Sequence, residues 1–175
     1  MAIRYYSTNR FVYSIPGIEP FTATVSFREA LLAGQAPDEG LFVPDPIPQL
    51  SMSEIIGLRD RPYWQAALLV ARTFLSDEFS DDVLADIAQD AYNYPVPLEA
   101  VYPRAFILRL DQGPTASFKD FAARMMARLM SHCRPEGERL NILVATSGDT
   151  GSAVGEAYKG VRGIDVTILY PADEV

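Results

Sequence analysis

The stretch of sequence that decides the fold runs from residue 140 to residue 170 and reads LNILVATSGDTGSAVGEAYKGVRGIDVTILY. Leu140–Ala145 is almost entirely apolar, as is typical of a parallel strand covered on both faces. Thr150–Lys159 reads as a helix, and Asp165–Tyr170 reads as another strand. A strand, a tight loop, a helix and a strand within about 30 residues form a βαβ unit. The sequence therefore predicts an α/β fold with an open, mainly parallel sheet and flanking helices.

The segment just upstream extends this pattern. Ala105–Leu110 is predicted to be a further strand of the sheet, and Ser117–His132 a helix with Ser117 as its N-cap. Apolar residues follow helical spacing along that helix, and such a stripe is more typical of a core than of a cofactor site. They are Phe121, Ala122, Met125, Met126, Leu129 and Met130.

The first hundred residues have a different character. Ser26–Ala33 is predicted to be a helix that begins with a capping box between Ser26 and Glu29. The proline-rich segment 36–50 predicts turns and extended chain, and helices are expected over residues 62–75 and 81–92. We therefore expect a mostly helical N-terminal lobe at residues 1–100, followed at residues 101–175 by the start of an α/β domain that is incomplete.

Composition limits the classes of function. The 175 residues carry a formal net charge of −8 and no basic cluster, which argues against nucleic acid and anionic membranes as partners. The N-terminus lacks the apolar core of a signal peptide, and no apolar run approaches the ~20 residues of a membrane span. Cys133 is the one cysteine, so no disulfide can form within the chain, and we expect it to be buried. These features predict a cytoplasmic protein.

One candidate site lies between the first strand of the βαβ unit and its helix, at Thr146–Gly151. Ligands of open α/β sheets bind at the carboxyl ends of strands, and a helix start attracts anions. The two glycines let the backbone approach a ligand, and hydroxyl side chains add hydrogen bonds. The segment lacks the Gly-Lys-Ser/Thr of a P-loop and the dinucleotide fingerprint. A carboxylate or phosphate site is one interpretation, and an ordinary strand-to-helix turn is the other.

A second candidate site lies at Gly113–Phe121, also between a predicted strand and a helix, and so it is expected to open at the same edge of the sheet. Lys119 falls in the first helical turn, where the positive end of the helix favours the neutral amine that attacks an aldehyde. Taken alone, such a lysine is more often an exposed surface residue. Phe118 and Phe121 can exclude water from it, and the anion-binding turn at Thr146–Gly151 is expected nearby.

These motifs resemble those of threonine synthases, a family of enzymes that use pyridoxal phosphate (PLP). Gly113–Phe121 resembles the family's PLP-lysine motif, Ala145–Gly151 its substrate-side loop, and Phe27–Pro44 its N-terminal signature. The resemblance implies half of a fold-type II PLP enzyme, with Lys119 as the catalytic residue that binds the cofactor covalently. It implies further cofactor contacts and substrate contacts in the two loops. The former are Phe118, Asp120 and Thr146, and the latter are Ser147, Gly148, Asp149 and Thr150.

The activity that the resemblance implies is the conversion of O-phospho-L-homoserine and water to L-threonine and phosphate, the last step of threonine biosynthesis. The chain is shorter than these enzymes, so we expect an N-terminal fragment with little activity alone and an uncovered apolar sheet face. A homodimer is kept open. Three alternatives remain: a serine/threonine dehydratase-like enzyme of the same fold type, a noncatalytic relative that retains the motifs, and an α/β domain that binds another phosphate ligand.

Overall fold

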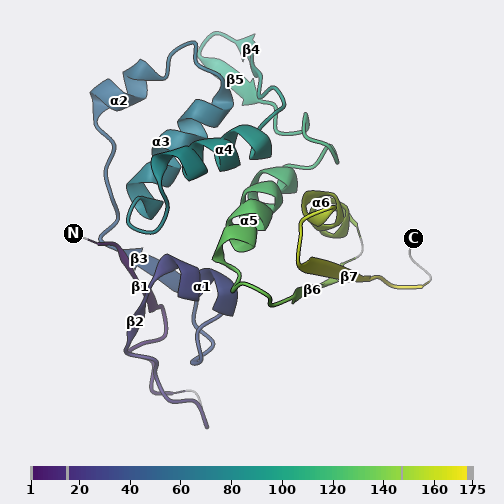
Figure 1. Ribbon diagram of the computed structural model, residues 1–175. Helices are drawn as coiled ribbons and strands as arrows, with labels where there is room; N and C mark the ends of the chain where they lie inside the picture. Colours follow the sequence, from purple (N-terminus) through teal and green to yellow (C-terminus); the bar gives the residue numbers. More distant parts are fainter. Residues whose placement is uncertain (1, 15, 147, 173–175) are drawn as a thin grey trace. The chain divides into compact units, whose positions relative to one another are not determined.

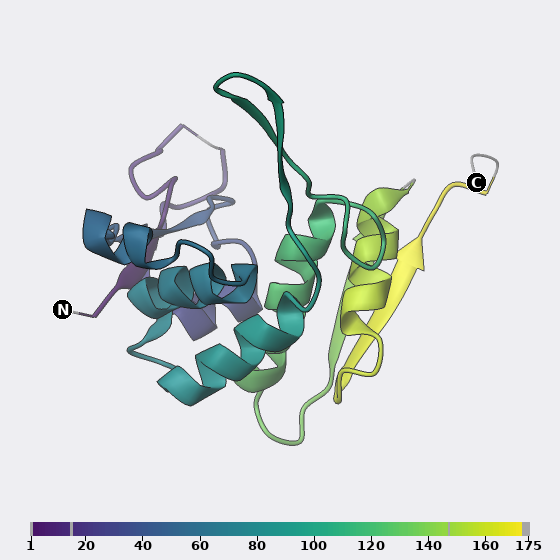
Figure 2. The same ribbon diagram turned by 90° about the horizontal axis from the view of Figure 1, so that it is seen from above.

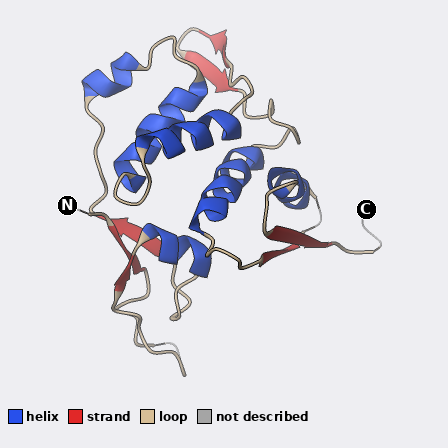
Figure 3. Ribbon diagram, in the orientation of Figure 1, coloured by secondary structure: helices blue, strands red, loops and turns tan. Residues whose placement is uncertain are grey.

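A computed structural model describes residues 2–14, 16–146 and 148–172 (Figure 1). Helices and short strands are interspersed along the chain (Figure 3). In chain order the elements are β1 (Arg4–Ser7), β2 (Thr24–Val25), α1 (Phe27–Ala33), β3 (Phe42–Asp45), α2 (Met52–Gly57), α3 (Tyr63–Leu75), α4 (Asp81–Ala91), β4 (Leu98–Tyr102), β5 (Ala105–Leu108), α5 (Lys119–Cys133), β6 (Leu140–Ala145), α6 (Asp149–Tyr158) and β7 (Ile164–Leu169).

The chain packs as two compact units. One unit comprises residues 1–59 and 68–84, and the other comprises residues 60–67 and 85–175. The domain boundary near residue 100 that the sequence indicates stays a prediction. Within the described residues, no helix is both long and apolar enough to span a bilayer.

The first unit contains a small antiparallel sheet that the prediction of a mostly helical lobe missed. Its strand order is β2-β1-β3, and Tyr5 of β1 lies opposite Val25 on one side and Pro44 on the other. These strands have two to four residues each, so they offer too little alternation for a pattern to be recognised.

Helix α1 has the boundaries that its local signals predict. The Ser26 hydroxyl accepts a hydrogen bond from the Glu29 backbone N–H at 3.2 Å, and the Ser26 N–H donates to the Glu29 carboxylate at 2.7 Å. The helix ends at Gly34, whose φ of 72° lies in the left-handed region that glycine tolerates. A second capping box, between Ser51 and Glu54, starts the short helix α2, which the sequence analysis did not identify.

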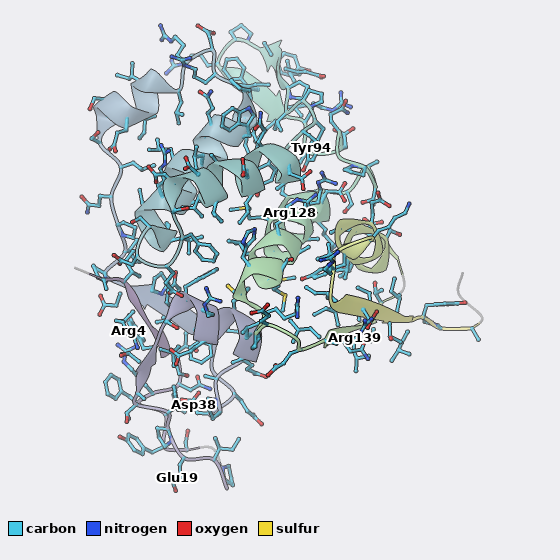
Figure 4. All side chains as sticks on the ribbon, in the orientation of Figure 1. Arg4, Glu19, Asp38, Tyr94, Arg128 and Arg139 are labelled. Atoms are coloured by element: carbon cyan, nitrogen blue, oxygen red, sulfur yellow. The ribbon has the colours of Figure 1, made fainter. Side chains whose placement is uncertain are left out.

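A buried polar pair ties the N-terminal strand to the loop before β3. Ser7 donates to the Asp38 carboxylate at 2.5 Å, and both residues are almost fully buried. The same carboxylate accepts the backbone N–H groups of Phe21 and Gly40 at 2.9 and 3.1 Å. Asp38 is labelled in Figure 4. A buried carboxylate is costly unless it is hydrogen-bonded, and these donors satisfy that need. We assign this cluster a structural role in the first unit.

The second unit contains the predicted βαβ unit. Strands β6 and β7 pair in parallel from Leu140 opposite Ile164 to Ala145 opposite Leu169, and α6 connects them. Helix α5 runs beside α6 (Figure 2). The two helices are joined by a bond from the Tyr158 hydroxyl to the Met130 sulfur at 3.0 Å. Burial raises the pKa of Tyr158 to about 12. Cys133, the last residue of α5, is buried, as predicted.

The prediction that residues 105–110 join the parallel sheet is wrong. That segment forms β5, which pairs antiparallel with β4 in a hairpin that extends away from α5 and α6 (Figure 2). The chain reverses at Arg104, whose positive φ of 66° allows the tight turn. Among the described strands only β6 and β7 pair in parallel, so the larger open sheet is not confirmed. Apolar side chains on the hairpin are exposed, as are Leu143 and Leu169 on the parallel pair.

Candidate active site

The loop that precedes α5 places Lys119 at the first position of that helix. The predicted N-cap, Ser117, is wrong by one residue, because Phe118 holds the cap position without a side-chain cap bond. Ala116 has a left-handed backbone conformation (φ 56°), and this turn places Ser117 next to the first residue of the helix. There the buried Ser117 hydroxyl accepts the Lys119 backbone N–H at 3.3 Å. The loop therefore fixes the backbone from which the Lys119 side chain projects.

Asp120 directs its carboxylate back into this loop. It is fully buried, and its two oxygens accept the backbone N–H of Thr115 at 2.9 Å and the Thr115 hydroxyl at 2.8 Å. A Cβ atom at Gly113 would overlap the Asp120 carboxylate, so the close approach depends on glycine at this position.

The turn between β6 and α6 is open at its surface. Thr146 accepts the Gly148 backbone N–H through its hydroxyl at 3.2 Å, and no described side chain caps α6. Gly148 and Asp149 are exposed, whereas Ser147 lies outside the described residues. Gly151 packs closely against the strand pair, since a Cβ there would lie 2.6 Å from Thr146 Cγ2. The turn therefore presents exposed backbone at a helix start, an arrangement that favours anions.

Lys119 and Thr150 line the same cavity, which has a volume of about 570 Å³. This size lies within the range of about 300–1,000 Å³ typical of small-molecule sites. Most of the lining is apolar and comes from β5 and its following loop, α5, α6 and the start of α3. The lining residues are Tyr63, Leu108, Leu110, Phe118, Lys119, Phe121, Ala122, Ala123, Met126, Thr150, Ala153 and Val154.

The Lys119 amine has an aromatic neighbour in this cavity. Its Nζ lies 4.9 Å from the centroid of the Phe118 ring, and that ring is itself largely exposed. Within the described part of the chain, no carboxylate forms an ion pair with Lys119. Of the predicted site residues, Phe118, Lys119 and Thr150 meet at the cavity. Asp120, Thr146, Gly148 and Asp149 are not among its lining residues.

Aromatic side chains that the sequence analysis missed support the start of α5. Tyr63 packs edge-on against Tyr92 and Phe121, with ring centroids 5.1 and 5.4 Å apart. The Tyr92 hydroxyl donates to the Phe121 carbonyl at 3.1 Å, and Tyr94 packs edge-on against the Phe121 ring at 5.5 Å. Burial raises the pKa of Tyr63 and Tyr92, and that of Tyr94 to about 12.

The stripe along α5 was predicted to be core, and only part of it is. Leu129 and Met130 are buried, whereas Phe121, Ala122 and Met126 face the cavity. The apolar residues of the stripe come in adjacent pairs, so the stripe covers a wide part of the helix surface. This width could have indicated that the helix contacts both a protein core and a cavity. The second unit is thus a βαβ unit with a preceding helix, and these elements line an apolar cavity that contains a lysine amine. The fold and the cavity thus define the class of protein, an α/β domain with a lysine amine in an apolar cavity.

Comparisons with known proteins find similarity to threonine synthases. A family model described as the threonine synthase N terminus matches residues 19–92. The threonine synthase of Haemophilus influenzae is 38% identical over 151 residues, which cover 86% of this chain and 35% of that protein. The Escherichia coli threonine synthase is 34% identical over the same shares.

Solved structures agree with the sequence matches. A PLP-bound threonine synthase from Brucella melitensis superposes with a TM-score of 0.88 at 34% identity, over 99% of this chain and 37% of that chain. The yeast threonine synthase gives a TM-score of 0.80 at 30% identity, over 98% of this chain and 36% of that one. The chain thus corresponds in sequence and fold to the N-terminal part of threonine synthases, and it spans about a third of the length of these relatives.

Proposed function

We propose that this chain carries the cofactor-binding lysine of a threonine synthase and contributes to the conversion of O-phospho-L-homoserine and water to L-threonine and phosphate. One observation carries the proposal. Lys119, the lysine of the motif, shares an apolar cavity with Thr150 from the turn expected to face the substrate. The similarity to a PLP-bound threonine synthase supports PLP as the cofactor.

The residues of the cavity fit PLP. A primary amine in a mostly apolar cavity can form a covalent bond with an aldehyde, and among the described residues no carboxylate forms an ion pair with that amine. Lys119 would hold the cofactor covalently, and the Phe118 ring would lie beside the amine. Of the other predicted contacts, Thr146 would act through the turn that it stabilises. When bound, PLP supplies an electron sink for reactions at the substrate's carbon atoms.

The chain's own residues have two tasks in this proposal. The turn Ser147–Thr150 and the start of α6 would bind an anionic group of the substrate, because backbone N–H groups at a helix start attract negative charge. The Lys119 amine, when it is free, would move protons at the substrate carbons as a general base. The apolar walls would exclude water from that proton transfer.

A substrate panel tests the reaction. PLP-loaded protein in excess over substrate is mixed with O-phospho-L-homoserine or with L-threonine, and the released phosphate and ammonia are measured. Protein in excess allows even slow conversion to be detected. Phosphate release from O-phospho-L-homoserine supports the proposal, whereas ammonia release from threonine favours a dehydratase-like enzyme.

A matched pair of variants controls this panel. Lys119 and Lys159 are the lysines of the sequence, and Lys159 is largely exposed and outside the cavity. We expect Lys119→Ala to abolish release and Lys159→Ala to leave it unchanged. Release that survives in Lys119→Ala would contradict the proposal. Absence of conversion together with absence of PLP on Lys119 would favour a noncatalytic relative.

A further inference from the structure

We propose that Asp120 is a positioning residue, which sets the Lys119 amine in the cavity by fixing the preceding loop to the first turn of α5. This inference rests on the proposed function, because it concerns the lysine that would bind PLP. It assigns to Asp120 a role different from the cofactor contact that the family motif implies. Asp120 does not line the cavity, so it acts through the backbone around Lys119.

The geometry connects three parts of the loop. Both carboxylate oxygens of Asp120 are used by Thr115, one by its backbone N–H and the other by its hydroxyl, at 2.9 and 2.8 Å. Gly113 lies so close to the carboxylate that any side chain there would overlap it. Ser117 completes the arrangement by accepting the Lys119 N–H. The loop therefore cannot shift relative to the helix start unless these bonds break.

The surroundings of the carboxylate make this arrangement specific. Asp120 has no exposed surface, and a buried carboxylate is costly unless hydrogen bonds satisfy it. Its position in the first helical turn also places the negative charge at the positive end of α5. Tyr94 lies near enough for the charge of Asp120 to add to the effect of burial on its pKa, and the Tyr94 hydroxyl has no partner among the described residues. The charge is thus confined to one place beside the Lys119 backbone.

Two variants separate positioning from simple stability. Asp120→Asn keeps the shape but removes the charge, and Thr115→Val keeps the shape but removes the hydroxyl donor. The matched control is Asp82→Asn. Asp82 occupies the second position of α4, as Asp120 does in α5, but its carboxylate is exposed.

The experiment has two readouts besides activity. PLP is added, the bond is reduced with borohydride, and the rate of labelling on Lys119 is compared with that on Lys159 by peptide mass spectrometry. Hydrogen exchange of the Thr115 amide is measured in the protein without PLP. For Asp120→Asn we expect Thr115 exchange to rise about 10-fold or more, because a charge-assisted bond is lost. Labelling of Lys119 at saturating PLP should fall by a similar factor, with the half-saturating PLP concentration little changed.

The outcomes decide between the proposals. Slower labelling of Lys119 in Asp120→Asn, with Asp82→Asn like the wild type, supports positioning. Equal labelling in Asp120→Asn and wild type overturns it, even when Thr115 exchange rises, and so does a loss that lies only in PLP affinity. If Asp120→Asn does not fold, Thr115→Val decides, with a smaller loss of the same kind expected. A wild-type protein without preference for Lys119 refutes the proposed function itself, and the positioning role falls with it.

Discussion

Gly151→Ala tests how closely α6 must approach the strand pair beside the candidate site. The added Cβ would lie 2.6 Å from Thr146 Cγ2 and 3.1 Å from Ile168 Cγ2, whereas carbon atoms in contact are normally about 3.5–4.0 Å apart. The helix must therefore move by about 1 Å, or Thr146 must leave its rotamer. Overpacking of this kind costs about 1–3 kcal/mol, and alanine in a helix returns about 1 kcal/mol. We expect a net loss of about 1 kcal/mol in the free energy of unfolding.

The assay is urea unfolding of matched variants. Gly155→Ala is the control, because its Cβ would meet only the flexible end of the Ile168 side chain, at 3.2 Å. That change should raise stability by up to about 1 kcal/mol. Thr146→Ser in the Gly151→Ala background removes the methyl group in conflict, retains the hydroxyl that accepts the Gly148 N–H, and should restore stability. If Gly151→Ala proves as stable as Gly155→Ala, or if Thr146→Ser brings no recovery, the reasoning about close packing is refuted.

Three further predictions concern the second unit. Tyr92→Phe removes a hydroxyl that donates to a carbonyl of α5 at 3.1 Å, and it should lower the free energy of unfolding by about 1 kcal/mol in urea; no change would show that the bond is unimportant. Arg124→Met removes a buried guanidinium that donates to two carbonyls at the end of α4 at 2.7 and 2.8 Å, and it should lower the free energy of unfolding by about 2–4 kcal/mol. Arg139→Met breaks an exposed ion pair and should lower it by less than about 1 kcal/mol. Equal losses in the two variants would contradict this expectation. Burial raises the pKa of Tyr94 and Tyr158 to about 12 from 10.0, so their contribution to stability is complete below pH 10 and is lost as the pH rises toward 12. Ultraviolet titration should show two tyrosines that ionise at a higher pH than the others. Ionisation of Tyr94 and Tyr158 near pH 10 would contradict their burial.

Local signals account for the parts of the fold that the sequence predicted well. The capping box at Ser26 and the glycine at Gly34 act within one helix, and the apolar run Leu140–Ala145 indicates a strand of a parallel pair. The expected cover on both faces of this strand is wrong, because its residues alternate between half-buried and exposed. The partner of β5 could not be predicted, because the hairpin depends on a left-handed turn at Arg104. Arginine rarely adopts a positive φ, so the sequence does not indicate a turn of this kind.

In the candidate site, too, some features could be predicted from the sequence and others could not. Lys119 and Thr150 could be predicted to meet, since each follows a loop and begins a helix that packs beside the other. Tyr63 could not be predicted, because it is far from the site in sequence and lies in a helix without a motif. The direction of the Asp120 side chain depends on the conformation of the Gly113–Thr115 loop, which no periodicity describes.

The claim that Lys119 binds PLP covalently is tested most directly by a peptide map of the wild-type protein after incubation with PLP and borohydride. Lys159 provides an internal reference in the same molecule, because its side chain is 77% exposed and lies outside the cavity. We predict that the pyridoxyl group is found on the Lys119 peptide at many times the level on the Lys159 peptide. Equal labelling of the two lysines, or labelling chiefly on Lys159, would contradict the account.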